Sequence, residues 1–330
     1  MREGAPPLRI VYEAEVRAAV AQESAITAVE EAFAALARGE ARLPGVINLD
    51  IPEAQGEIHV KGAHLEGAPF YAFKVATGFY GNHLRGLPTG AGLFLVGDAA
   101  TGLPVALLLD NGYLTELRTG AAGAVAARWL ARPELRKVAV VGAGVQARFQ
   151  VRALAAVRAV PRVEVWSRDA ARAAACAAEL RAELGVDAAA APSVEAAVRD
   201  ADLVVTVTPS RTPLVRGEWL SAGAHVTAVG SDGPEKQELD VGVLARADRV
   251  FADHLGQCLR LGELHHAVDA GVLSAADVAG ELGEVIIGRV AGRTAGDQLT
   301  VCDLTGVGVQ DAAIAAAAAR ALGLEPVGGA

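Results

Sequence analysis

The sequence predicts an α/β fold with a doubly wound parallel sheet of the Rossmann type, and three observations support this prediction. Residues Lys137 to Arg158 run from an apolar strand through a glycine turn into a stretch with helical periodicity. A second apolar strand, Val163 to Trp166, follows after a crossover of the length that joins parallel neighbours. Further strands alternate with helical stretches at Val186 to Ala190, Ala201 to Thr208, Ala224 to Gly230 and Arg249 to Ala252.

The glycine turn has the spacing of a dinucleotide-binding fingerprint, Gly-x-Gly-x-x-Ala. Gly142 permits the tight turn, Gly144 leaves the backbone open to a pyrophosphate, and Ala147 allows the helix to pack closely on the strand. The free N–H groups of the following helix can then hold an anion. Glycine turns also end buried strands that bind nothing, but the crossover and the second strand favour a dinucleotide site.

Length and composition narrow the class of protein. The 330 residues suit two domains, and a chain that is 52% apolar but only 4% aromatic must build its core from Ala, Val and Leu. A net charge of −9, without a basic cluster or an aromatic ladder, argues against nucleic acid as a partner. The N-terminus lacks the apolar core of a signal peptide, and no apolar run has the length of a membrane span.

Cysteine and histidine usage favours a reducing compartment and no metal. The three cysteines, Cys176, Cys258 and Cys302, are far apart and odd in number. The histidines show no ligand spacing, and the adjacent pair His265 and His266 would face different sides of a helix. We therefore expect a cytoplasmic protein without a metal site.

The N-terminal third combines one helix with several strands. Residues Ser24 to Arg38 carry apolar side chains at helical spacing, with Gly39 as the stop. A hairpin is expected where the turn Asp98 to Gly102 separates two apolar runs. The predicted strands are Glu57 to Gly62, Pro69 to Ala76, Gly92 to Gly97 and Pro104 to Asp110.

Lys74 lies within the most apolar of these strands. Alternation places Lys74 on one face together with Phe70, Ala72 and Ala76, so its neighbours on that face are apolar. A lysine in such surroundings loses its proton more easily, which suits acid–base catalysis. The alternative is a lysine on the solvent face of an edge strand.

Arg118 has an unusual place in the next helix, TELRTGAAGAVAARWLARP. If Thr115 is the N-cap, Arg118 falls at the third helical position, where the helix dipole disfavours a cation. A substrate carboxylate, held by the guanidinium and the helix end together, would explain the position. The alternative is a solvated arginine that tolerates it.

The carboxyl ends of the parallel strands are predicted to face the ligand crevice. Arg168 stands near the place where an acid receives the ribose of NAD, so it favours NADP(H), whereas Asp169 keeps NAD(H) possible. Asp232 follows another strand and is placed either for chemistry or as a turn residue before Pro234. The residues expected to contact the cofactor are Thr119, Gly142, Gly144, Val145, Gln146, Ala147, Ser167, Arg168, Thr206, Thr208, Val229, Gly230 and Ser231.

The final third is predicted to end in strand, turn and helix. A helical stretch from Gln257 to Ala270 leads through a polar loop to the strand and turn Gln298 to Gly306. An Ala-rich helix, Val309 to Leu322, follows it, with Asp311 near its start.

Six segments together resemble the ornithine cyclodeaminase and mu-crystallin family. In the family's order they are FKVATGFYGNHLRGLPTG, GYLTELRTGAAGAVAARWLARP, VAVVGAGVQARFQ, VEVWSRD, VGSDGPEKQELD and LTVCDLTGVGVQD. The resemblance implies a Rossmann domain, 117–303, inserted into a discontinuous α+β substrate and dimerisation domain, 1–116 and 304–330, in a homodimer. It maps the substrate-carboxylate arginines onto Arg42 and Arg118, the active-site lysine onto Lys74 and the active-site aspartate onto Asp232.

Members of this family carry out several reactions with these parts. Some are cyclodeaminases, which are lyases that recycle NAD, some are amino-acid dehydrogenases or cyclic imine reductases, and mu-crystallin binds a small ligand. Where ornithine cyclodeaminases carry a glutamate for the distal amine, this chain has His59 or Lys61, and a cationic Lys61 would repel that amine. It would suit a tail that is neutral or acidic. Within the family, the chain resembles the ectoine-utilisation and alanine-dehydrogenase-like branches more than it resembles ornithine cyclodeaminase proper.

We therefore expect an enzyme that moves hydride between NADP(H) or NAD(H) and Cα of a small amino acid or its imine. Arg42 and Arg118 would hold the carboxylate, with Lys61 near the substrate tail. Lys74 would move the proton, and Asp232 would balance its charge and steer the developing iminium. The alternatives are the cyclodeaminase lyase and a low-turnover NADP-dependent binding protein.

Overall fold

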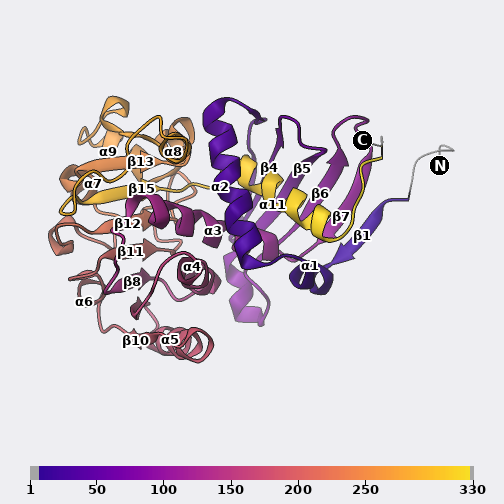
Figure 1. Cartoon of the computed structure of the whole chain (residues 1–330). Coiled ribbons are helices and arrows are strands. Elements are labelled where there is room, and N and C mark those ends of the chain that lie inside the picture. The colour runs from indigo at the N-terminus through magenta and orange to yellow at the C-terminus, as the bar shows by residue number, and fades with distance from the viewer. Residues whose placement is uncertain (1–6, 328–330) are drawn as a thin grey trace. The chain divides into compact units, whose positions relative to one another are not determined.

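The computed structural model describes residues 7–327, and the chain divides into two compact units (Figure 1). One unit comprises the chain up to Arg118 together with the segment from Val307 onward, and the other comprises Thr119–Gly306. These boundaries lie two to three residues from the expected ones, at 118 instead of 116 and at 306 instead of 303. No helix within residues 7–327 is long and apolar enough to cross a membrane.

The first unit contains a seven-stranded sheet. Its order is β1-β7-β6-β5-β4-β2, with β3 also paired to β4. Only the β1–β7 pair is parallel, and the other pairs are antiparallel. The strands are β1 (Arg9–Tyr12), β2 (Ala41–Arg42), β3 (Ile47–Ile51), β4 (Gly56–Leu65), β5 (Phe70–Phe79), β6 (Gly90–Asp98) and β7 (Pro104–Leu109).

The predicted hairpin and the predicted helix stop of this unit are confirmed. Asp98 Oδ1 accepts hydrogen bonds from the N–H groups of Ala100 at 2.8 Å and Thr101 at 2.7 Å, which closes the turn between β6 and β7. Helix α2 (Gln22–Arg38) ends at Gly39, whose φ of +79° favours glycine. Helix α1 (Glu13–Ala19) precedes it.

Helix α11 (Gly308–Ala321) packs across β4 and β5, with α2 beside it, as Figure 1 shows in yellow and indigo. The approach is close at its first residue, because a Cβ on Gly308 would lie 2.4 Å from the carbonyl oxygen of Gly62. Small side chains along the helix permit this contact. The start of α11, including Asp311, therefore lies on the face of the sheet that buries Lys74.

The second unit contains an eight-stranded sheet in which every pair is parallel, so the predicted Rossmann arrangement is confirmed. Its order is β10-β9-β8-β11-β12-β15-β13-β14. From β8 the chain adds β9 and β10 on one side of the sheet, and it then returns to add β11 on the other side of β8, which is the topological switch point. The strands are β8 (Val138–Val141), β9 (Arg162–Trp166), β10 (Asp187–Ala190), β11 (Leu203–Thr206), β12 (His225–Ala228), β13 (Arg249–Ala252), β14 (Gly280–Glu281) and β15 (Thr300–Asp303).

Alternate residues of these strands bury themselves on opposite faces of the sheet. Ala139 and Val141 join one apolar cluster, whereas Val138 and Val140 join the other. Both clusters consist mainly of Ala, Val and Leu, as the composition predicted. The helices of this unit, with α3 entering from the first, are α3 (Tyr113–Leu130), α4 (Val145–Ala155), α5 (Ala170–Leu184), α6 (Val194–Val198), α7 (Val241–Arg246), α8 (Leu255–Leu261), α9 (Glu263–Asp269) and α10 (Leu282–Ile286).

Two helix predictions are wrong. The single helix predicted from Gln257 to Ala270 is broken at Gly262, where a Cβ would lie 2.2 Å from a carboxylate oxygen of Asp303. Helix α3 begins at Tyr113, so Thr115 is not its N-cap. Asp110 Oδ2 accepts a hydrogen bond from the N–H of Leu114 at 2.7 Å and caps this end instead.

Candidate functional site

The first unit contains a buried ionic cluster formed by Lys74, Arg118 and Asp311. Asp311 Oδ1 lies 2.9 Å from Lys74 Nζ and 3.0 Å from Arg118 Nε. The exposed fractions are 2% for Lys74, 7% for Arg118 and 0% for Asp311. Strand β5 supplies the lysine, the second turn of α3 supplies the arginine and the first turn of α11 supplies the aspartate.

Lys61 adds a third cation to this cluster. It is the register partner of Lys74 across β4 and β5 and is only 7% exposed. Its charge lowers the pKa of both Lys74 and Asp311. The charges of Lys74, Arg118 and Lys61 thus all act on the carboxylate of Asp311.

Burial lowers the pKa of Lys74 to about 7, and the charges of Arg118 and Lys61 act in the same direction. The ion pair with Asp311 raises the pKa but does not offset the loss of hydration. The alternation argument for this lysine is confirmed, because Lys74 is buried on the predicted face. A lysine that titrates near neutral pH can both accept and donate a proton at physiological pH.

The charge partner of Lys74 was not found from the sequence. Asp232 was expected to balance that charge, but Asp311 pairs with Lys74. Burial raises the pKa of Asp311, but Arg118, Lys74 and Lys61 outweigh burial, so the net shift is downward. Asp311 therefore stays ionised and holds both the lysine and the arginine in place. The signal in the sequence was a lone acid in an otherwise apolar, Ala-rich helix.

Arg118 is held by α11 at two points, so the interpretation of a solvated arginine is wrong. Besides its ion pair with Asp311, its Nη1 donates a hydrogen bond to Gln310 Oε1 at 2.8 Å. The helix-dipole argument for Arg118 also fails, because α3 begins earlier than predicted. Within residues 7–327, the buried Gln310 Nε2 and Asp311 Oδ2 have no hydrogen-bond partner. A donor and an acceptor suited to a carboxylate and an amine thus lie beside the arginine.

Asp110 is a further buried acid near the cluster. Its Oδ2 caps α3, while its Oδ1 has no hydrogen-bond partner among the residues that the structure describes. Burial raises its pKa to about 6, against the effect of the backbone N–H groups and the charge of Lys74. Arg42, in contrast, is exposed on the two-residue strand β2 and lies outside the buried cluster.

In the second unit, the glycine turn has the geometry that a dinucleotide site requires. Gly142 has a φ of +123°, and a Cβ there would lie 2.8 Å from the carbonyl oxygen of Val207. Gly144 is the N-cap of α4, without a side-chain cap, and a Cβ on it would meet nothing within 4 Å. Ala147 is fully buried. The turn therefore fits a pyrophosphate, which the first N–H groups of α4 can bind.

The tip of β9 carries Ser167 and the exposed Arg168. Asp169 is the N-cap of α5, where its Oδ1 accepts hydrogen bonds from Ala171 N at 2.9 Å and Arg172 N at 3.2 Å. Its carboxylate is thus engaged by the helix. The guanidinium of Arg168, in contrast, is exposed at this tip and suits the 2′-phosphate of NADP(H).

The other predicted cofactor residues surround the carboxyl ends of β11 and β12, together with the first turns of α4 and the neighbouring α3. Thr206 ends β11 and Thr208 follows it, while Val229, Gly230 and Ser231 follow β12. Val145 and Gln146 begin α4, and the carbonyl oxygen of Thr119 accepts a hydrogen bond from Gln150 Nε2 at 2.9 Å. Asp232, 42% exposed at its side chain, pairs with the buried Lys236 at 2.7 Å. The sequence interpretation had not singled out Lys236.

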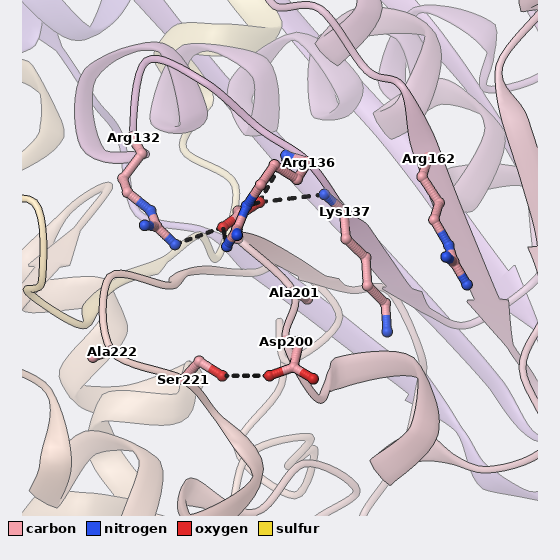
Figure 2. A pocket seen from close by; sticks show the side chains of 9 residues that line it. Arg132, Arg136, Lys137, Arg162, Asp200, Ala201, Ser221 and Ala222 are labelled. Carbon is pink, nitrogen blue, oxygen red and sulfur yellow. Dashed lines mark hydrogen bonds and ion pairs between the residues drawn. The ribbon is translucent and has the colours of Figure 1, made fainter.

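A cavity of about 390 Å³ in this unit lies at the opposite, amino ends of the strands. Arg132 and Arg136 bind Asp202 at 2.5 and 2.9 Å, and Figure 2 shows these two arginines among the side chains that line the cavity. Two of its arginines are thus paired with one buried carboxylate, and the cavity lies at the other edge of the sheet from the glycine turn. Its lining residues are Arg132, Arg136, Lys137, Arg162, Asp200, Ala201, Asp202, Ser221 and Ala222.

A Rossmann unit with a pyrophosphate-binding turn, together with a buried lysine, arginine and aspartate, defines a nicotinamide-dependent enzyme that acts on amino acids or their imines. The chain belongs to the ornithine cyclodeaminase/mu-crystallin family, whose model matches residues 8–320. A putative dehydrogenase of Rhizobium meliloti is 49% identical over 309 residues, which cover 93% of this chain and 94% of the relative.

Two solved structures are similar over nearly the whole chain. An archaeal alanine dehydrogenase dimer with bound NAD has a TM-score of 0.89 and 36% identity, covering 95% of each chain. The Δ1-pyrroline-2-carboxylate reductase of Thermococcus litoralis, in complex with NADH and L-proline, has a TM-score of 0.92 and 28% identity. That likeness covers 96% of this chain and 99% of the reductase.

Proposed function

We propose that the protein is an NAD(P)(H)-dependent amino-acid dehydrogenase or imine reductase that works with net redox. The observation that carries this proposal is the buried Lys74, which has a pKa of about 7. It forms an ion pair with Asp311, and Asp311 also pairs with Arg118. When bound, the nicotinamide supplies the acceptor or donor of the two electrons and the hydrogen that leave or reach Cα. A general acid–base group at the substrate nitrogen is then what the protein has to add.

The residues of the first unit divide this work. Arg118 binds the substrate carboxylate and fixes Cα, and Gln310 Nε2 adds a donor to the same group. In the oxidative direction Lys74 takes a proton from the substrate amine, so that the amine becomes an imine as its C–H bond breaks. After it has released this proton to solvent, Lys74 takes a proton from the water whose oxygen adds to the imine carbon, and it passes that proton to the nitrogen, so that the C–N bond breaks and ammonia leaves. In reduction it returns the proton to nitrogen.

The remaining predicted residues have narrower roles. Asp311 orients Lys74 and Arg118, and Asp232 stabilises positive charge that develops on the substrate. The turn at Gly142 and the start of α4 bind the pyrophosphate. Arg42 is proposed as a second contact to the substrate carboxylate, although its place on β2 is exposed. Lys61 faces the substrate tail and disfavours a distal ammonium, which speaks against ornithine cyclodeamination.

NADP(H) is the proposed cofactor, because Arg168 is exposed while Asp169 is held as a helix cap. The two similar structures hold NAD and NADH, so direct comparison of the two dinucleotides is essential. A cytoplasmic homodimer is proposed as well. The three buried free cysteines suit a reducing compartment, and Ile47 and Leu49 on edge strand β3 are 64% and 56% exposed.

The test is to supply a panel of substrates and to monitor each reaction by the absorbance of the reduced nicotinamide. Amino acids are supplied with NADP⁺ or NAD⁺, and 2-oxo acids plus ammonium or cyclic imines are supplied with NADPH or NADH. We expect stoichiometric formation or loss of reduced cofactor with an amino acid or imine that has a neutral or acidic tail. Release of ammonia from a diamine without net cofactor change would instead identify the lyase, and tight ligand binding without turnover would identify a binding protein.

A further inference from the structure

Glu238 joins two loops that contain predicted cofactor-binding residues. Its Oε1 accepts a hydrogen bond from the N–H of Thr208 at 2.5 Å, and its Oε2 accepts one from the N–H of Gly230 at 2.8 Å. Thr208 follows β11 and Gly230 follows β12, which are neighbours in the sheet. One fully buried carboxylate thus fixes both loops at the carboxyl edge.

The contact leaves little room for any other arrangement. A Cβ on Gly230 would lie 2.2 Å from the carbonyl oxygen of Thr208 and 2.5 Å from Glu238 Oε2. The loop after β11 also packs against the glycine turn, since a Cβ on Gly142 would approach Val207 O at 2.8 Å. The pyrophosphate turn and both strand-end loops therefore form one packed layer, and the side chain of Glu238 is hydrogen-bonded to both loops.

A second carboxylate holds Glu238 itself. Glu263, buried on α9, accepts hydrogen bonds from the N–H of Glu238 at 2.7 Å and of Leu239 at 3.1 Å. Asp303 in turn accepts a hydrogen bond from Leu264 N at 2.9 Å. Burial raises the pKa of Glu238 to about 7 and that of Glu263 well above its usual range. Both side chains are shielded from water, so a backbone N–H that loses its bond to either of them would be left without a replacement partner.

We propose that Glu238 is a positioning residue for the dinucleotide: by clamping the loops at Thr208 and Gly230, it sets the surface on which the nicotinamide half of the cofactor binds. This inference rests on the proposed nicotinamide-dependent function. Because the loops are fixed before the cofactor arrives, binding does not have to order them. Glu238 contacts neither substrate nor cofactor in this role.

The test compares Glu238→Gln with Asp202→Asn in the full-length protein. Both residues are buried carboxyl groups that accept two backbone N–H bonds, but Asp202 binds the N–H groups of Arg136 at 2.7 Å and Lys137 at 3.3 Å and precedes β11, at the amino edge of the sheet. Affinity for NADH and NADPH is measured from nicotinamide fluorescence, and stability from thermal unfolding. A glutamine side chain has only one acceptor oxygen and cannot accept both N–H bonds. We therefore expect the Kd of the Glu238→Gln variant for the dinucleotides to rise about tenfold.

The control and a second variant make the outcome decisive. Asp202→Asn is expected to lower Tm while leaving the Kd within about twofold. Glu238→Asp keeps the carboxyl group with a shorter reach and is expected to give an intermediate Kd, with an unchanged KM for the amino acid. It also serves if Glu238→Gln does not fold. A lowered Tm with unchanged dinucleotide affinity in both Glu238 variants would overturn the positioning role alone. Failure of the wild-type protein to bind either dinucleotide would overturn the proposed function as well.

Discussion

Lys74 Nζ and Asp311 Oδ1 form an ion pair of 2.9 Å in which neither residue is more than 2% exposed. Strand β5 and helix α11 supply the two residues, and Arg118 shares the same carboxylate oxygen. A buried lysine that retains an ionised partner but still titrates near pH 7 is unusual for a structural salt bridge, since pairing alone would raise its pKa. A lysine of this kind suits general acid–base catalysis.

Replacing Lys74 with Met should abolish most of the turnover. Met keeps much of the apolar volume but carries no proton, so kcat should fall by about 10²–10⁴-fold, as expected for the loss of a general acid–base group. Single-turnover kinetics with saturating dinucleotide measures this effect. Lys137→Met is the control, because Lys137 pairs with Glu164 in the second unit at 3.1 Å. A Lys74 variant within a few-fold of wild type would contradict the assignment.

The pH dependence should have opposite signs in the two directions. Lys74 has a pKa of about 7, so it is neutral above that pH and can accept a proton, while below it the ammonium can donate one. The kcat/KM for amino-acid oxidation should therefore rise through pH 7 and then level off, and that for imine reduction should fall over the same range. Initial rates from about pH 5 to 10 in both directions check this, and the shared inflection should vanish in Lys74→Met.

Asp311→Asn should move that inflection toward lower pH. The carboxylate of Asp311 raises the pKa of Lys74, so its removal leaves burial, Arg118 and Lys61 to lower it further. The variant should also lose about 3–5 kcal/mol of stability, because it leaves buried cations without their partner. Urea unfolding measures the stability, and the pH profile measures the shift. An unmoved inflection would show that the titrating group in the profile is not Lys74.

Lys61→Glu should alter which substrate tail is accepted. Lys61 lies across from Lys74 in the β4–β5 register, and reversal of its charge should attract a distal ammonium and repel a second carboxylate. The ratio of kcat/KM for diamino over dicarboxylic substrates should rise by about 10–100-fold. Lys61→Met serves as the neutral comparison and should give an intermediate ratio. Equal ratios in all three proteins would place the substrate tail elsewhere.

Arg168→Ser should weaken binding of NADPH by about tenfold and leave NADH nearly unchanged, because only NADPH has a 2′-phosphate for the guanidinium. Titration of each dinucleotide against the purified protein measures the two Kd values. Arg162→Ser, at the other end of β9, is the matched control. If the wild type prefers NADH and Arg168→Ser changes neither Kd, the preference for NADP(H) is wrong.

The sequence sufficed where local pattern determines structure. The glycine turn, the alternation around Lys74 and the alternation of strands with helices along the second unit all follow from near neighbours in the chain. The long-range partners did not follow from it. Asp311 stood out only as an acid at the start of an Ala-rich helix, and the helix break at Gly262 lies against the carboxylate of Asp303, which comes from β15. Such pairings are set by packing between distant segments and leave no periodic signal.

Helix α11 belongs to the first unit, but in the sequence it follows the whole second unit. During synthesis Lys74 and Arg118 therefore leave the ribosome long before the aspartate that neutralises them. Until translation reaches residue 311, the nascent sheet carries cations that it cannot bury at low cost. The unit that holds the proposed catalytic lysine is thus completed last, and a chain that ended before α11 would carry Lys74 and Arg118 without their counter-ion.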